Sequence, residues 1–162
     1  MAIHKATNTI YINDVGQTAW EEINNATAAN RNFGWPTEEG YNALPTSIYD
    51  EPSYAYEHPG DVASDSTGYA ITGGTFYDPV TPKYPAEYVD KYFFLEFNRQ
   101  WINYIDPDDD FNDGHGHIHD LASTRKTFGT ALPNGGIYLT MSPDGYLYYF
   151  SRIDNILYKI TY

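Results

Sequence analysis

Two adjacent carboxylates, Glu21 and Glu22, lie between two tight corners of the chain and could bind a hard cation. One corner is at Gly16, and the other is the segment Asn-Phe-Gly-Trp-Pro that ends at Pro36. Glycine lets the backbone turn tightly, and proline holds the residue before it extended. Carboxylate and main-chain oxygens held between such corners are ligands that calcium prefers. The alternative is a solvated acidic turn whose flanking tryptophans, Trp20 and Trp35, are packing anchors.

A second acidic stretch, Asp106–Asp120, has oxygen-bearing side chains at the spacing of a calcium loop. Asp113 and His119 stand where an EF-hand needs glycine and a bidentate glutamate, so a solvated loop is the favoured interpretation. Its histidines alternate at 115, 117 and 119, and on an extended segment they would share one face suited to a transition metal. Solvent exposure of all three is the favoured alternative.

The elements that would position these residues are short strands rather than helices. Runs of β-branched and aromatic residues are separated by turn residues, and helical periodicity is almost absent. The predicted strands are Asn8–Asn13, Ser53–Tyr56, Tyr69–Tyr77, Lys91–Phe97, Trp101–Ile105, Gly136–Met141, Tyr146–Ser151 and Ile156–Tyr162. A bulge or a close backbone approach is expected at Gly73-Gly74, and a hairpin turn at Ser142–Gly145. The pattern predicts an all-β propeller or sandwich.

Composition limits the partners. The 162 residues carry a formal charge of −13 and contain no cysteine. Nucleic acids and anionic membranes are disfavoured as partners because the negatively charged protein would repel them. Disulfides and thiolate metal sites are excluded because there is no cysteine. No apolar run is long enough to span a membrane. Met1–Lys5 leads into polar residues, so we expect no signal peptide in this chain.

Four motifs, in order, resemble the glucose/sorbosone dehydrogenase family, which includes pyrroloquinoline-quinone (PQQ) sugar dehydrogenases and, more distantly, Hedgehog-interacting protein. The first is Asp-Val-Gly-Gln through Asn-Phe-Gly-Trp-Pro and Glu-Gly, over residues 14–40. The others are Ala-Ile-Thr-Gly-Gly-Thr-Phe-Tyr at 70–77, the run from Tyr-Pro-Ala-Glu-Tyr to Tyr-Phe-Phe at 84–94, and Ser-Pro-Asp-Gly-Tyr-Leu-Tyr-Tyr at 142–149 with the ending at 157–162.

The resemblance implies a partial six-bladed β-propeller. All motifs match the C-terminal half of the family pattern, so residues 1–162 are expected to form a single domain of about three four-stranded blades, at about 40 to 50 residues per blade. A half-ring leaves strand edges and an apolar seam exposed. We therefore expect either a longer protein or a homodimer that closes the ring by twofold symmetry. The family also implies a secreted or periplasmic location.

The resemblance also implies metal and cofactor sites. Glu22, with Glu21 adjacent, and the carbonyl of Phe33 correspond to the ligands of a structural calcium. The backbone oxygens of Gly16 and Gln17 correspond to those that hold a second calcium, which polarises PQQ in the active enzymes.

The residues that would hold PQQ itself are replaced. Arginines that pair with this tricarboxylate correspond here to Gly135 and Ile137, and a third to Asp78. The half that carries the catalytic histidine is missing, so no catalytic residue is assigned. We expect a PQQ-dependent sugar dehydrogenase-like segment that is inactive alone. The alternative is a non-catalytic, calcium-containing module that binds carbohydrate or protein.

Overall fold

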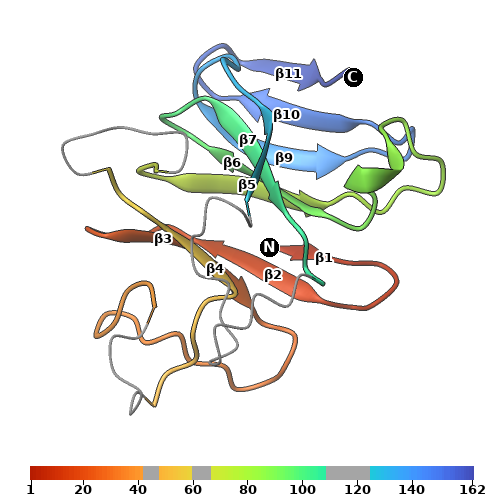
Figure 1. Cartoon of the computed structure of the whole chain (residues 1–162). Helices are drawn as coiled ribbons and strands as arrows, with labels where there is room; N and C mark the ends of the chain where they lie inside the picture. Colours follow the sequence, from red (N-terminus) through yellow and green to blue (C-terminus); the bar gives the residue numbers. More distant parts are fainter. Residues whose placement is uncertain (42–47, 60–66, 109–124) are drawn as a thin grey trace.

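The computed structural model describes residues 1–41, 48–59, 67–108 and 125–162. Their strands form three antiparallel sheets in chain order (Figure 1). The first sheet contains β1 (Ala2–Ile3), β2 (Ile10–Asp14), β3 (Trp20–Asn25) and β4 (Tyr54–Glu57). The second contains β5 (Ile71–Phe76), β6 (Tyr92–Glu96), β7 (Trp101–Ile105) and β8 (Lys126–Gly129). The third contains β9 (Gly136–Met141), β10 (Leu147–Ser151) and β11 (Ile156–Lys159).

The predicted all-β class is confirmed. Helical structure in the described residues is limited to one 3-10 turn, Ala86–Tyr88, and none of it is long and apolar enough to cross a membrane. The sheets are stacked, with the second between the first and the third (Figure 1). This arrangement agrees with the predicted three blades, except that the third sheet has three strands in the described chain.

Aromatic side chains fill the space between the sheets. Between the first and second sheets, Tyr11 packs edge-on against Tyr92 at a ring-centroid distance of 5.0 Å. Between the second and third sheets, Leu139, Leu147 and Tyr149 join a buried cluster with Phe93. Rings suit these positions because they cover large areas of a pleated surface.

Strand β5, at one edge of the second sheet, lies very close to the third sheet. A Cβ atom on Gly73 would lie 2.2 Å from the main-chain nitrogen of Leu139 in β9. The pairing of β5 with β6 also shifts register between Ile71 and Gly74. Both the predicted bulge and the predicted close approach at Gly73-Gly74 are therefore confirmed.

Three strands were not predicted. β1 is only two residues long, and β8 lies where a polar connection was expected. β3 was expected to lie in a possible solvated acidic turn, but Glu21 is fully buried and Glu22 is 6% exposed. The solvated-turn interpretation is therefore wrong. Its packing anchors are also wrong in part, because Trp35 is 59% exposed while Trp20 is half-buried.

Candidate functional site

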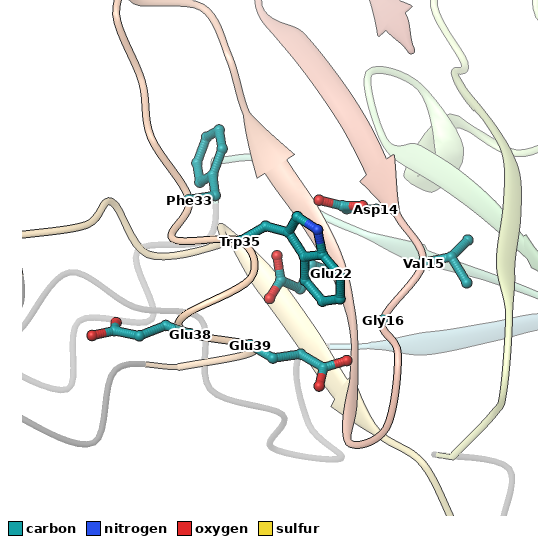
Figure 2. Close-up of a pocket in the computed structure, with 8 residues that line it drawn as sticks. All are labelled: Asp14, Val15, Gly16, Glu22, Phe33, Trp35, Glu38 and Glu39. Atoms are coloured by element: carbon teal, nitrogen blue, oxygen red, sulfur yellow. The ribbon is translucent and has the colours of Figure 1, made fainter.

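A small acidic pocket lies where the β2–β3 turn meets the loop that follows β3. Its volume is about 10 Å³, which is the space of about one water molecule or one ion. Four of its lining residues are acidic, and Figure 2 shows the Glu38 carboxylate pointing away from that of Glu22. The lining consists of Asp14, Val15, Gly16, Glu22, Phe33, Trp35, Glu38 and Glu39.

Glu22 is positioned by strand alternation. Successive residues of a strand point to opposite faces, so Glu22 points away from the second sheet while Ile23 is fully buried on the other face. The Glu22 carboxylate accepts a hydrogen bond from the Gly40 amide at 2.5 Å and one from the Asn24 side chain at 3.1 Å. Burial raises its pKa, although both hydrogen bonds oppose the rise.

Asp14 and Glu39 bring two further carboxylates to the pocket. Asp14 is the cross-strand partner of Glu22. Burial raises the pKa of Asp14, and the Glu39 charge adds to the rise. Glu39 accepts hydrogen bonds from the main-chain amide and the hydroxyl of Thr18, both at 3.2 Å. Burial would raise the pKa of Glu39, but main-chain amides of the β2–β3 turn outweigh it, and the pKa is lowered.

These carboxylates repel one another in a space of the size of one ion. The charges of Asp14 and Glu39 both contribute to the raised pKa of Glu22. A bound cation would remove this repulsion. Nowhere in the described ranges do three acidic or histidine side chains converge closely enough to hold a metal by themselves. A cation here would therefore also need main-chain oxygens, as calcium sites commonly do.

The structure separates the two adjacent glutamates predicted as metal ligands. Glu21 points to the opposite face of β3, where its Oε1 lies 2.6 Å from His58 Nε2 and its Oε2 accepts a 2.6 Å hydrogen bond from the Ile71 amide. Burial raises its pKa, and these hydrogen bonds oppose the rise. Both carboxylate oxygens thus have partners outside the pocket, and a direct metal–Glu21 contact remains a prediction without geometric support.

Gly16 and Phe33 line the same pocket as Glu22. A Cβ atom at Gly16 would lie 1.6 Å from the Trp20 carbonyl oxygen, so only glycine fits this turn. Gln17 is exposed and lies outside the lining, and its amide is one of those that stabilise the Glu39 carboxylate. The roles of these backbone oxygens in binding a second calcium remain predictions.

Sequence reasoning named Glu22, Gly16 and Phe33 but missed Asp14, Glu38 and Glu39 as pocket residues. The signal was present, because Asp14 begins the turn that contains Gly16 and the Glu38-Glu39 pair belongs to the same motif. The second acidic stretch cannot be compared in this way, since residues 109–124 lie outside the described residues.

The residues present do not fit PQQ. A tricarboxylate needs cationic partners, yet the lining of the acidic pocket contains no lysine or arginine. Asp78, which the resemblance aligns with an arginine, contacts Lys5. Its Oδ2 accepts a hydrogen bond from the Lys5 amide at 2.8 Å, and its Oδ1 lies 3.3 Å from Lys5 Nζ. Ile137 is 39% exposed and apolar.

Comparison with known proteins supports the fold. No protein-family model and no curated protein sequence matches the chain. Among solved structures, a glucose dehydrogenase matches 99% of this chain over 42% of its own length, with 14% identity and a TM-score of 0.67. A soluble aldose sugar dehydrogenase from Escherichia coli matches 92% of this chain over 40% of its own, with 20% identity and a TM-score of 0.60.

An oxidoreductase from Thermus thermophilus, described as a glucose dehydrogenase, matches 93% of the chain over 38% of its own length, with 16% identity and a TM-score of 0.57. The chain therefore spans about two fifths of the structures that it matches. At sequence identities of 14% to 20%, the similarity is evidence for the fold alone. In its fold, this chain corresponds to a part of a sugar-dehydrogenase propeller.

Proposed function

We propose that this chain is the calcium-binding segment of a sugar-dehydrogenase-like propeller and that it does not oxidise sugars by itself. The observation that supports calcium binding is the acidic pocket of about 10 Å³, whose lining includes Asp14, Glu22 and Glu39. Glu22 would be the main side-chain ligand, and the Phe33 carbonyl would supply a main-chain oxygen. The ion would join the β2–β3 turn to the loop that follows β3.

The proposal that the chain alone is inactive rests on the poor fit to PQQ. PQQ accepts electrons from the sugar when it is bound in an active enzyme. In this chain Asp78 and Ile137 stand where the family resemblance places cationic partners, and the resemblance assigns the chain to the half that lacks the catalytic histidine. A dehydrogenase reaction would therefore require further protein. We also propose, from the family resemblance, that the protein is secreted or periplasmic.

Terbium luminescence tests the cation site directly. Trp35 lines the pocket, so its excitation should sensitise Tb³⁺ bound there, and excess Ca²⁺ should displace the signal. We expect Glu22→Gln to weaken binding at least about tenfold, because it removes a charged ligand. Glu87→Gln is the matched control, because it removes the same charge from an exposed residue outside the pocket. Equal binding by both variants would contradict the assignment.

Aldose-dependent dye reduction tests the inactivity. Purified protein is supplied with PQQ, Ca²⁺ and an aldose, and we expect a rate equal to that of the protein-free control. A rate above this background that is lost in Glu22→Gln would show that the chain is a dehydrogenase on its own. The outcome of this assay does not change the interpretation of the terbium experiment.

A second candidate function is carbohydrate binding without catalysis. Trp35 is 59% exposed beside a set of carboxylates, and an exposed aromatic ring next to polar groups is suited to stacking on a sugar. Aldose titration monitored by tryptophan fluorescence, with and without Ca²⁺, tests this function. Trp35→Ala should abolish a saturable change, and a change that persists in this variant would exclude Trp35 as the binding residue.

A further inference from the structure

The third sheet has an apolar row across the face that points away from the second sheet. Leu139 and Tyr149 are paired and buried against the second sheet. By alternation, Tyr138, Phe150 and Leu157 lie on the opposite face, and Phe150 is paired with both of the others. Tyr138 is 57% exposed and Leu157 is 59% exposed. A continuous apolar row across three strands is a candidate interaction surface.

The first sheet has a similar feature on its own outward face. Tyr11 points inward to Phe76 and Tyr92, and the adjacent Ile12 therefore points outward. Ile3 is paired with Ile10 in the neighbouring strand, on this same outward side. Ile3 is 53% exposed and Ile12 is 37% exposed. The three isoleucines form an apolar patch over β1 and β2.

The two outward faces lie at opposite ends of the stack, with the second sheet between them (Figure 1). One copy of the chain cannot bring them together. The inward faces of the same two sheets are covered by apolar packing against the second sheet. Packing of a further sheet on each outward face would repeat that arrangement, and a second copy presents both faces that are needed.

The charges on the two outward faces also favour contact between the third sheet of one copy and the first sheet of another. The outward face of the third sheet also carries Lys159, which is level with Tyr148. The outward face of the first sheet carries Asp14, which is level with Glu22, and Glu57, which is level with Trp20. In a chain with a formal charge of −13, two identical acidic faces would repel each other. Lys159 is paired with Asp144 of the same chain at 3.1 Å, so the two charges offset each other on the third sheet. Contact between unlike faces therefore avoids the repulsion between two acidic faces.

We infer that the Tyr138–Phe150–Leu157 row of one copy docks on the Ile3–Ile10–Ile12 patch of a second copy. Twofold symmetry then creates two equivalent interfaces, in each of which the third sheet of one copy meets the first sheet of the other.

Molar mass by light scattering on the full chain tests the inference. The wild-type protein at tens of micromolar should have twice the 18.4 kDa mass of the chain. Leu157→Asp and Ile12→Asp should each weaken dimerisation at least about tenfold, because each places a charge in both interfaces. Val80→Asp is the matched control, since Val80 is fully exposed and belongs to neither face. Circular dichroism confirms that each variant is folded.

A mixing experiment distinguishes the head-to-tail arrangement from other dimers. In a mixture of Leu157→Asp and Ile12→Asp, one of the two interfaces contains no introduced charge, so a heterodimer should form more tightly than either variant alone forms a homodimer. A dimer disrupted by Leu157→Asp but not by Ile12→Asp would overturn the inference in favour of two third sheets in contact. A wild-type monomer would overturn it in favour of a different covering partner.

Discussion

The carboxylate of Glu21 and the main-chain amide of Ile71 form a 2.6 Å hydrogen bond that joins the first sheet to the beginning of the second. The other oxygen of Glu21 lies 2.6 Å from His58, which follows β4. A fully buried carboxylate thus connects three segments that are distant in sequence. It is stabilised by partners rather than by solvent, which is the usual condition for burying a charge.

Removal of the Glu21 side chain should destabilise the fold. Glu21→Ala leaves the buried Ile71 amide without its acceptor, which costs about 1–3 kcal/mol. Glu21→Gln keeps a carbonyl oxygen for Ile71 and an amide that can donate to His58, so this variant should lose less stability than Glu21→Ala. Urea unfolding followed by circular dichroism measures the free energies of unfolding of both variants. An alanine variant as stable as wild type would show that this hydrogen bond does not contribute to stability.

A methyl group at Gly73 should separate the second and third sheets. The new Cβ would lie 2.2 Å from the main-chain nitrogen of Leu139, and main chain cannot move aside as a flexible side chain can. Overpacking of this kind typically costs about 1–3 kcal/mol. Gly129→Ala is the control, because its Cβ would meet the nearest heavy atom, in Leu132, at 3.9 Å. Equal free energies of unfolding for the two variants would contradict the close approach.

The stability of the calcium-free protein should rise as the pH is lowered from neutral towards the ordinary pKa values of its buried carboxylates. Asp14, Glu21 and Glu22 have pKa values raised above their ordinary values of 3.8, 4.5 and 4.5. Between the ordinary and the raised pKa the folded state binds more protons than the unfolded state, so its stability falls as the pH rises through that window. Carboxylates with lowered pKa values, such as Glu39, contribute stability that is lost only at lower pH.

Excess Ca²⁺ should reduce this pH dependence, because the ion favours the charged forms of Asp14 and Glu22. Thermal melting of metal-free and Ca²⁺-loaded protein across the same pH range measures the effect. Glu22→Gln removes one of the titrating groups and should flatten the metal-free profile. A metal-free melting temperature that falls as the pH is lowered over this range would contradict the assignment of raised pKa values.

Tyr92→Phe should destabilise the fold through one hydrogen bond. The buried Tyr92 hydroxyl donates to the Asn13 side-chain oxygen at 2.7 Å, and the Asn13 amide nitrogen donates to the Thr72 carbonyl. Loss of the hydroxyl should cost about 0.5–1.5 kcal/mol, since a partly buried acceptor loses its partner. A double-mutant cycle with Asn13→Ala measures the coupling, and strict additivity would show that the two residues do not act together.

The fold was predictable where strands carry apolar residues or where turns have a distinct sequence. The strands β6 and β7 and the turn at Ser142–Gly145 correspond closely to the expectation. β3 was missed because four of its six residues, Trp-Glu-Glu-Ile-Asn-Asn, are acidic or amide side chains. Their burial depends on partners such as Ile71 and Gly40, which are distant in sequence and invisible to local patterns.

The candidate site was predictable in part. The family resemblance brought Glu22, Gly16 and Phe33 together, and the structure places all three in one lining. The grouping of Glu21 with Glu22 ignored the alternation of a strand, which sends neighbouring side chains to opposite faces. Asp14 could have been found from the same alternation once β2 and β3 were paired in register, which requires the tertiary structure.

Thr72 is attached to both neighbouring sheets at once. Its carbonyl accepts from Asn13 of the first sheet, and its hydroxyl donates to the Gly136 carbonyl of the third at 2.8 Å. Separation of the first or the third sheet would therefore disturb β5, which the remaining sheet also contacts. The amide hydrogens of β5 should consequently be exchanged for deuterium only when all three sheets open together, so that the stack behaves as one cooperative unit rather than three separable ones.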